Sequence, residues 1–166
     1  AAKNGITEEE LKKVLHRCKE KLMQARSNRI RPLLDDKVIL GWNALMNTAC
    51  SKAYAATGEE KYRQLAIENM NFLLQYFAAN GTEEFYHTWK NNRARYPAFL
   101  DDYAFLIEAL VHLQEVTGNK EWINKAKAIT EHVIGHFSEP ETGFFYYTKT
   151  GQKDVIVRKK EVYDGA

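Results

Sequence analysis

The stretches GWNALMNTACSKAYAATG (residues 41–58) and DDYAFLIEALVHLQEVTG (residues 101–118) decide the fold, because the second repeats the first after a shift of 60 residues. The pairs that match in position are Ala44 with Ala104, Ala49 with Ala109, and Thr57-Gly58 with Thr117-Gly118. Apolar residues recur at helical spacing in both stretches. Glycine enters the left-handed conformation that closes a helix without steric strain, so each stretch predicts a helix that ends at its Thr-Gly turn.

The repeat continues beyond these two helices. A second helical pattern follows each Thr-Gly turn, and an aromatic segment follows that pattern. The further matched pairs are Tyr62 with Trp122, Ala66 with Ala126, Phe72 with His132, Phe77 with Phe137, Phe85 with Phe145, Tyr86 with Tyr146, and Thr88 with Thr148. Small residues let helices approach closely, so the Ala-rich first helix of each unit is predicted to be inner and the second outer. A repeat of this length predicts a toroid of helical hairpins rather than a solenoid of shorter repeats.

These boundaries predict an all-α fragment of an α/α toroid, with antiparallel helical hairpins joined by small β-hairpin loops. A capping box at Thr7 and Glu10 begins a first helix, expected over about residues 8–26. The hairpins are expected over about 39–79 and 101–137, and a β-hairpin loop over about 143–160. A third inner helix would begin near Asp164. Residues 1–166 are thus one partial toroid domain, less than half of a six-hairpin barrel.

Composition excludes several functional classes. The net charge of the 166 residues is +2, and the basic residues are spread among acidic ones, so no nucleic-acid footprint is expected. No apolar run is long enough to cross a membrane and no signal peptide is recognisable, which predicts a cytoplasmic protein. Cys18 and Cys50 are expected to be reduced core thiols. Motifs for dinucleotides, nucleoside triphosphates, zinc proteases and nucleophile elbows do not occur, so no cofactor and no metal are expected.

Four motifs together identify a family resemblance. They are RPLLDDKVILGWNALM, FLDDYAFLIEAL, the TG…W turn, and the closing R.K…YDGA. They resemble the spermatogenesis-associated, thioredoxin-domain-containing family, over about residues 30–166. The resemblance implies an (α/α)6 toroid related to N-acylglucosamine 2-epimerases and six-hairpin glycosidases. It also implies a thioredoxin-like domain in the parent chain, and it suggests a carbohydrate without naming a reaction.

Asp101 and Asp102 are the first candidates for chemistry, because they open an inner helix at one mouth of the expected barrel. A carboxyl group whose pKa is raised by burial can act as a general acid or base on a sugar, while its neighbour orients the substrate. Asp102 is the first choice for that role. The alternative is that an aspartate here caps the helix and meets its dipole. Adjacent residues on a helix point about 100° apart, so the two are not expected to face each other across one glycosidic bond.

Other residues at the same mouth are candidates for substrate binding. An aromatic ring can stack on the C–H face of a sugar while an amide binds its hydroxyls. The predicted binding residues are Asp36, Trp42, Asn43, Arg95 and Tyr103. The loop FYHTWKNNRARYP adds exposed aromatics, arginines and His87. The alternatives are that Trp42 is a core residue, that Asn43 bonds its local backbone, and that the loop packs its own aromatics.

The spacing of His132 and His136 is that of a metal pair, but the repeat places them over Phe72 and Tyr76, which predicts core or interhelical roles.

Two functions remain open. The first is a toroid whose intact parent binds, epimerises or hydrolyses a carbohydrate or a related small polar molecule. The second is a non-catalytic interaction or regulatory module that accompanies a thioredoxin-like domain. A partial toroid leaves inner-helix surfaces uncovered, so self-association is also expected.

Overall fold

A computed structural model describes residues 5–79, 81–153 and 155–160, and it divides the chain into two compact units, residues 1–35 and 36–166. The first unit contains helix α1 (Glu8–Ser27), which begins at the capping box of Thr7 and Glu10. None of the side chains of α1 is buried. Cys18 is therefore exposed, and its predicted place in a core is wrong, whereas Cys50 of the second unit is buried. That residues 1–35 share a domain with the hairpins stays a prediction.

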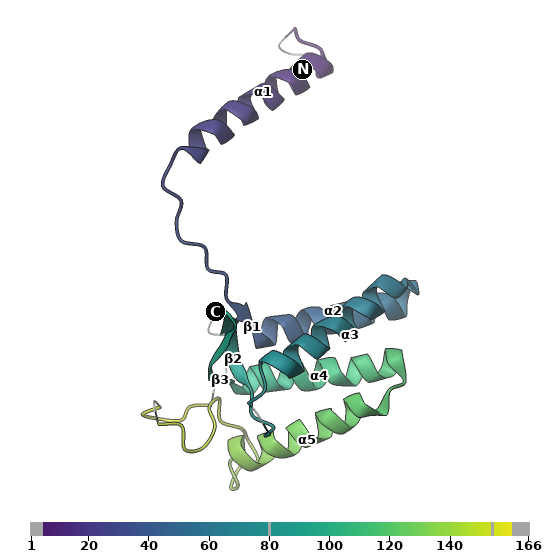
Figure 1. Cartoon of the computed structure of the whole chain (residues 1–166), viewed down its shortest axis with the longest axis vertical. Helices are drawn as coiled ribbons and strands as arrows, with labels where there is room; N and C mark the ends of the chain where they lie inside the picture. Colours follow the sequence, from purple (N-terminus) through teal and green to yellow (C-terminus); the bar gives the residue numbers. More distant parts are fainter. Residues whose placement is uncertain (1–4, 80, 154, 161–166) are drawn as a thin grey trace. The chain divides into compact units, whose positions relative to one another are not determined.

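The second unit consists of two helical hairpins and a small sheet, as the repeat predicts (Figure 1). The first hairpin is α2 (Leu40–Thr57) and α3 (Glu60–Tyr76), and the second is α4 (Leu100–Thr117) and α5 (Lys120–Phe137). The two inner helices α2 and α4 pack most extensively on each other, and each also packs on the outer helix of its own hairpin. The predicted all-α toroid class is thus confirmed, with a three-stranded sheet in addition.

The two Thr-Gly turns have the same backbone conformation and the same hydrogen bonds. Gly58 and Gly118 both have a φ of 69°, and the N–H of each donates to the carbonyl four residues earlier. The hydroxyls of Thr57 and Thr117 likewise donate to the carbonyl four residues earlier, at 2.8 and 2.7 Å. The matching extends past the outer helices, where isolated β-bridges join Ala78 to Phe85 and Ser138 to Phe145.

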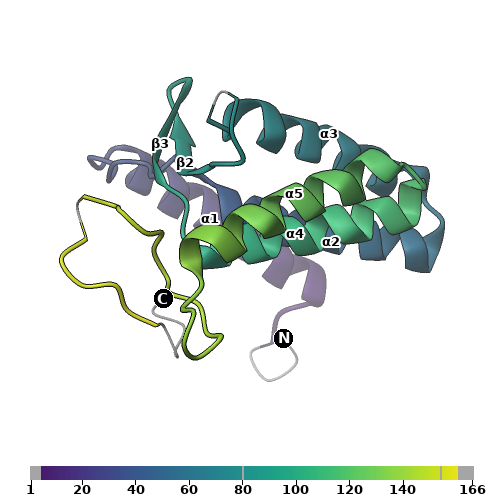
Figure 2. The ribbon, with the colours of Figure 1, turned by 90° about the horizontal axis from the view of Figure 1, so that it is seen from below.

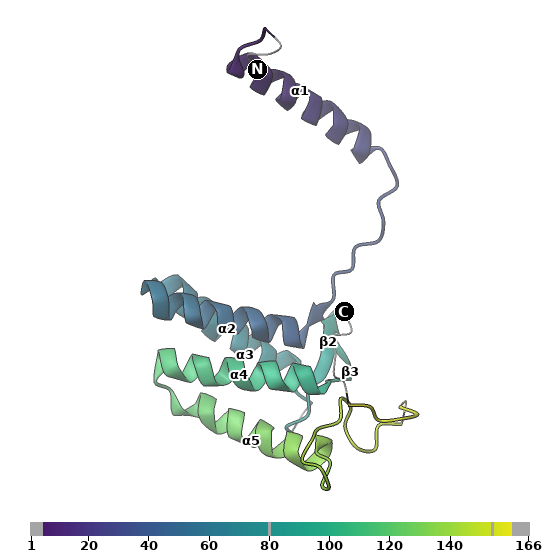
Figure 3. The same cartoon turned by 180° about the vertical axis from the view of Figure 1, so that it is seen from behind.

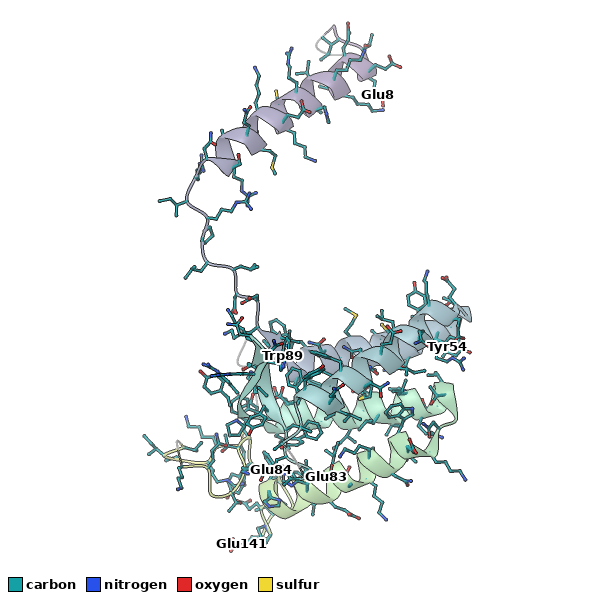
Figure 4. The ribbon with its side chains drawn as sticks, in the orientation of Figure 1. Glu8, Tyr54, Glu83, Glu84, Trp89 and Glu141 are labelled. Atoms are coloured by element: carbon teal, nitrogen blue, oxygen red, sulfur yellow. The ribbon has the colours of Figure 1, made fainter. Side chains whose placement is uncertain are left out.

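The sheet lies at the end of the bundle where α2 and α4 begin, as the views from front and back agree (Figures 1 and 3). Its antiparallel strands are β1 (Val38–Ile39), β2 (Tyr86–Lys90) and β3 (Arg93–Pro97), in the order β1-β2-β3. Asn91 and Asn92 form the tight turn of the β2–β3 hairpin with φ values of 51° and 56°, as two-residue hairpin turns require. Trp89 anchors the sheet on the helices, with its ring 5.5 Å from that of Phe72 (Figure 4).

The second β-hairpin, expected over about residues 143–160, does not form ladders in the described part of that segment. A two-stranded hairpin is marginal alone, and the first gains a third strand and the Trp89 anchor. Lys149 stands where the repeat would place that tryptophan. The segment nevertheless lies at the sheet end of the bundle (yellow in Figures 1 and 2), where Leu100 N–H donates to the Tyr147 carbonyl at 3.0 Å. Asp164 and its predicted helix lie outside the described residues.

The core lies between the inner and outer helices. Its largest side chains come from all four helices of the second unit and from the C-cap residue of α3; they include Leu40, Met70, Leu73, Phe77, Tyr103, Leu106, Leu110, Leu113, Ile129 and Phe137. The equivalent Phe77 and Phe137 are both fully buried, so the repeat sets the core as well as the turns. None of the helices in the described residues is long and apolar enough to span a membrane.

Candidate functional site

Asp102 is the centre of the polar cluster at the sheet end of the bundle. Its side chain is only 2% exposed, yet it makes three hydrogen bonds, two of them accepted from backbone N–H groups and the third with a histidine ring. Oδ1 accepts from the Gly41 N–H of α2 at 2.9 Å. Oδ2 accepts from the Phe99 N–H at the start of α4 at 3.0 Å and contacts His87 Nδ1 of β2 at 2.7 Å. One carboxyl group therefore joins the beginnings of both inner helices to the sheet.

The bond to Gly41 replaces an N-terminal cap that helix α2 lacks. Helix α2 has no acidic residue in its first turn and no side-chain cap at Ile39. The free N–H groups of a helix start need an acceptor, and Asp102 supplies one from the next repeat unit. A Cβ at Gly41 would lie 2.9 Å from Asp102 Oδ1, so only glycine leaves room for this approach.

His87 is the partly accessible member of the cluster, with 26% of its side chain exposed. Asp102 holds its Nδ1, and the ring of Phe99 lies edge-on at 5.0 Å between centroids. Among the described residues none is found to bond Nε2. A carboxylate on one ring nitrogen fixes the tautomer and orientation of an imidazole, which leaves the other nitrogen to act on a ligand.

Asp101 lies beside this pair but has a different environment. Its side chain is exposed, and it accepts hydrogen bonds from the Asp102 N–H at 2.9 Å and from the Tyr147 hydroxyl at 3.2 Å. The ring of Tyr147 stacks on Phe99, with centroids 4.9 Å apart and planes 11° apart. His87, Phe99 and Tyr147 thus form a row of rings beside the two aspartates.

Burial sets the electrostatics of the cluster. It raises the pKa of Asp102, while the Phe99 N–H and the His87 ring oppose the rise. Burial likewise raises the pKa of Tyr103 to about 12, so this phenol stays protonated at neutral pH. Asp102 is therefore a helix cap, as the alternative reading of the Asp-Asp pair predicts, and it is also the partner of a titratable ring. A catalytic role for Asp102 itself stays a prediction.

The predicted binding residues fall in different places. Trp42 follows Gly41 in the first turn of α2, and 71% of its side chain is exposed, so it is not a core residue. Asn43 donates to the Ile39 carbonyl at 2.9 Å and accepts from Asn69, as the local alternative predicts. Tyr103 is buried in the core, where its hydroxyl accepts from the Phe85 N–H at 3.0 Å. The cavity that Tyr103 lines has a volume of only about 40 Å³, too small for a sugar.

Asp36 and Arg95 lie at the sheet, apart from the two aspartates of α4. Asp36 forms an ion pair with Lys90 at the end of β2, and this bond lowers the pKa of Asp36. Arg95 stands opposite Thr88 in the β2–β3 ladder, with its side chain exposed. The structure therefore brings Asp101 and Asp102 together with His87, and it groups Asp36 and Arg95 with the lysines of the sheet.

Sequence reasoning named His87 only as part of a loop that could bind the substrate, and it did not select Phe99 or Tyr147. His87 and Asp102 are 15 residues apart on different kinds of element, so no helical or strand spacing links them. Tyr147 comes from the segment after α5. The one available signal was that the loop preceding the Asp-Asp pair carries a histidine.

Metal binding has no support in the described residues, where no three His, Cys, Asp or Glu side chains gather to hold an ion. His132 and His136 instead stack on each other with centroids 4.3 Å apart. Nδ1 of His136 bonds the His132 carbonyl, and His132 contacts the ring of Tyr103 at 5.7 Å. The pair lies within α5 and beside α4, as the interhelical reading predicts.

Comparison with known proteins agrees with the family resemblance. An uncharacterised protein of Caenorhabditis elegans is 36% identical over 178 residues, which cover 100% of this chain and 23% of that protein. Spermatogenesis-associated protein 20 of Mus musculus is 29% identical over 181 residues, which cover 100% of this chain and 22% of that protein. The chain thus spans less than a quarter of the length of these relatives.

Solved structures share the fold at low sequence identity. Cellobiose 2-epimerase from Spirochaeta thermophila superposes with a TM-score of 0.61 and 15% identity, over 67% of this chain and 28% of that chain. A GH76 α-mannanase from Bacteroides thetaiotaomicron gives a TM-score of 0.65 and 13% identity, over 72% and 34% of the two chains. The family model of N-acylglucosamine 2-epimerase (GlcNAc 2-epimerase) matches residues 9–162. With its repeated hairpins and this match over most of its length, the chain belongs to the N-acylglucosamine 2-epimerase family.

Proposed function

We propose that His87, positioned by Asp102, transfers a proton to or from a carbohydrate bound where α2 and α4 begin. The observation that carries this proposal is the 2.7 Å contact between His87 Nδ1 and the buried Asp102 carboxyl group, beside a partly exposed imidazole ring. Imidazole exchanges protons near neutral pH, so it suits general acid–base catalysis. Asp102 is then a positioning residue, since its own oxygens are taken by three donors.

Epimerisation is the reaction that this arrangement fits. Inverting carbon 2 of a reducing sugar requires a base that removes the proton beside the carbonyl of the open chain, and an acid that returns it to the other face. A single oriented imidazole can transfer the proton on one face of carbon 2. A cellobiose 2-epimerase is among the structural neighbours, which supports a sugar of this kind as the ligand.

The neighbouring side chains support sugar binding. The exposed ring of Trp42 stands next to Gly41, which bonds Asp102, and it offers an apolar face for a pyranose ring. Asp101 is exposed and can accept hydrogen bonds from sugar hydroxyls. In this proposal Asp101 and Trp42 bind the ligand, and Asn43 and Tyr103 support the surrounding helices. Asp36 and Arg95 lie on the sheet and do not contact the carbohydrate.

Glycoside hydrolysis is a second candidate. One structural neighbour is an inactive α-1,6-mannanase variant in which two consecutive aspartates are replaced by asparagine, in complex with α-1,6-mannotriose. The consecutive Asp101 and Asp102 motivate the comparison. The buried and fully bonded Asp102 favours the epimerase-like reaction over one in which it attacks a sugar directly.

The test uses the full natural chain that contains these residues, as wild type and as His87→Asn. The asparagine amide can still donate to Asp102 but cannot exchange a proton at neutral pH. We expect the wild type to incorporate deuterium at carbon 2 of a reducing sugar such as cellobiose in D₂O, as seen by NMR. We expect His87→Asn to lose at least about 100-fold in this rate while it still binds the sugar.

Each outcome separates the candidates. Deuterium incorporation that persists in His87→Asn would remove His87 from the reaction. Release of monosaccharide without exchange at carbon 2 would favour hydrolysis and direct attention to Asp101. A thermal-shift screen of the same two proteins with mono- and disaccharides reports binding independently of turnover, and no shift with any sugar would favour the non-catalytic interaction module.

We also propose that the isolated 166-residue chain associates with itself. The inner helix α2 carries exposed apolar side chains at helical spacing, chiefly Trp42, Leu45 and Met46. Contiguous apolar faces of this kind mark interaction surfaces.

A further inference from the structure

We propose that the face of the three-stranded sheet that carries Lys37, Lys90, Arg93 and Arg95 binds the phosphate group of a small molecule. This inference goes beyond the carbohydrate site, because it concerns other residues and another ligand chemistry. It rests on the strand register, on a cavity, on two arginines that have no ion pair among the described residues, and on one strained residue.

The strand register gathers the four cations. Side chains alternate between the two faces of a strand, and cross-strand partners share a face. Lys90 pairs with Arg93, and Thr88 pairs with Arg95 in the next step of the ladder. Val38 of β1 pairs with Trp89, so Lys37, the residue before β1, comes beside Lys90. The four cations are spread from position 37 to position 95 in the sequence and become neighbours only in the sheet.

His87 and Trp89 alternate with these residues and belong to the opposite face. His87 contacts Asp102 of α4, and the Trp89 ring packs on Phe72 and Tyr76 of α3 (Trp89 in Figure 4). The helices thus cover the face with His87, and the basic face points away from them. The two candidate sites are therefore separated by the sheet itself.

The basic face encloses a cavity of about 200 Å³. Its lining consists of Lys37, Thr88, Lys90, Asn91, Arg93, Arg95 and Tyr96. Pockets for drug-sized ligands measure roughly 300–1,000 Å³, so this one suits a phosphate group with a small carrier. Guanidinium groups bind phosphate oxygens through two parallel hydrogen bonds, and lysine adds a mobile point charge.

The cations of this face differ in how their charge is balanced. Asp36 forms an ion pair with Lys90, but no ion pair of Arg93 or Arg95 is found within the described part of the chain. Like charges directly opposite each other in a ladder destabilise a sheet, and Lys90 faces Arg93 in this way. A bound dianion would relieve this repulsion, whereas a neutral sugar would not.

Tyr96 is held in a strained conformation at the rim of the cavity. Its φ is +60°, in the left-handed region, and it precedes Pro97, which disfavours helical conformations in the residue before it. The residue is 61% exposed. Strained residues persist where the surrounding structure fixes them, and they cluster at ligand sites. The exposed ring can contact the carrier of the phosphate.

The experiment measures binding of inorganic phosphate, glucose 6-phosphate and glucose by calorimetry, with chloride at equal ionic strength as the reference. The variant is Arg93→Gln/Arg95→Gln. The matched control, Lys120→Gln/Lys127→Gln, removes the same charge from the exposed side of α5. We expect phosphate and glucose 6-phosphate to bind the wild type and the control, and their affinity to fall at least tenfold in the arginine variant.

Two results would overturn the proposal. They are equal phosphate affinity in the arginine variant and the control, and no phosphate binding by the wild type above the chloride reference. Arg93→Lys/Arg95→Lys guards against misfolding, because it keeps the charge and removes only the planar fork. We expect this variant to have an unchanged circular dichroism spectrum and a phosphate affinity between those of the wild type and the glutamine variant. A wild-type affinity would show that charge alone suffices and would overturn the role of the planar guanidinium groups. The experiment leaves His87 and Asp102 intact, so its failure is distinct from a failure of the carbohydrate site.

Discussion

At the scale of single residues, Asp102 shows how one side chain can serve stability and chemistry together. It caps its own helix through Phe99 N–H, caps the neighbouring helix through Gly41 N–H, and holds His87. A buried carboxyl group with several donors is costly to remove, because each abandoned N–H loses about 1–3 kcal/mol. Loss of activity on substitution of Asp102 would therefore be ambiguous, and His87 is the better target for testing the reaction.

Gly41 gives the sharpest prediction at this scale. Replacing glycine by alanine inside a helix usually stabilises it by up to about 1 kcal/mol. At Gly41 the added Cβ would lie 2.9 Å from Asp102 Oδ1 and 3.3 Å from the Phe105 ring, so the carboxyl group must move and its bonds weaken. We expect Gly41→Ala to lower the free energy of unfolding by about 2 kcal/mol, measured by urea denaturation.

Gly135 of α5 is the matched control. It is also a helical glycine without a positive φ, but nothing lies within 4 Å of an added Cβ. Gly135→Ala should therefore raise the free energy of unfolding by about 0.5 kcal/mol. If both substitutions stabilise the protein, the close approach of Asp102 to α2 is not a feature of the fold.

At the scale of elements, the sequence contains most of the fold in its repeat. Helical spacing and the Thr-Gly turns were enough to predict α2 to α5, because these signals are local and each occurs twice. The absence of ladders from the second hairpin segment could not be predicted from its strand propensity alone. The first hairpin has a third strand and the anchoring ring of Trp89, whereas Lys149 stands at the equivalent position of the second unit.

The candidate site was less predictable, because its contacts join residues that are far apart in the sequence. Asp102 is 61 residues from Gly41 and 15 residues from His87. Such contacts depend on packing between elements, which no local pattern records. The basic face has the same origin, because its four cations come together only through the register of three strands.

His132 marks a position at which the two outer helices α3 and α5 differ. It stands where α3 has Phe72, and its buried Nε2 has no hydrogen-bond partner among the described residues. Burial lowers its pKa, and the neighbouring His136 lowers it further. We expect His132→Phe to raise the free energy of unfolding at neutral pH by about 1 kcal/mol, because it removes an unsatisfied buried polar group.

The pH dependence of the same variant follows from the direction of the pKa shift. A histidine whose folded pKa is lowered binds fewer protons in the folded state than in the unfolded state, so stability falls as pH falls through its ordinary value of about 6.5. Urea denaturation at about pH 7.5 and about pH 5.5 should show a smaller loss on acidification for His132→Phe than for the wild type. Equal losses in the two proteins would mean that His132 is not the responsible group.

At the scale of the whole molecule, the chain covers only part of the toroids that it resembles, 28% of the epimerase and 34% of the mannanase. An inner helix of a closed barrel has an inner neighbour on both sides, whereas among the described residues of the second unit the inner helix α2 has only α4. Its remaining face is apolar and exposed at Leu45 and Met46. Burying a large apolar side chain contributes about 1.5–3 kcal/mol, so this face favours association.

We therefore expect the isolated chain to show a mass that rises with concentration in light scattering, and Leu45→Lys/Met46→Lys to shift this transition to at least tenfold higher concentration. Both side chains are exposed, at 42% and 62%, so lysines there leave the core intact. Ile123→Lys/Ile134→Lys is the control, because these residues are exposed on the outer helix α5. Association that responds equally to both pairs would indicate nonspecific attraction between apolar surfaces, and a wild type that stays monomeric at high concentration would exclude α2 as a contact between copies.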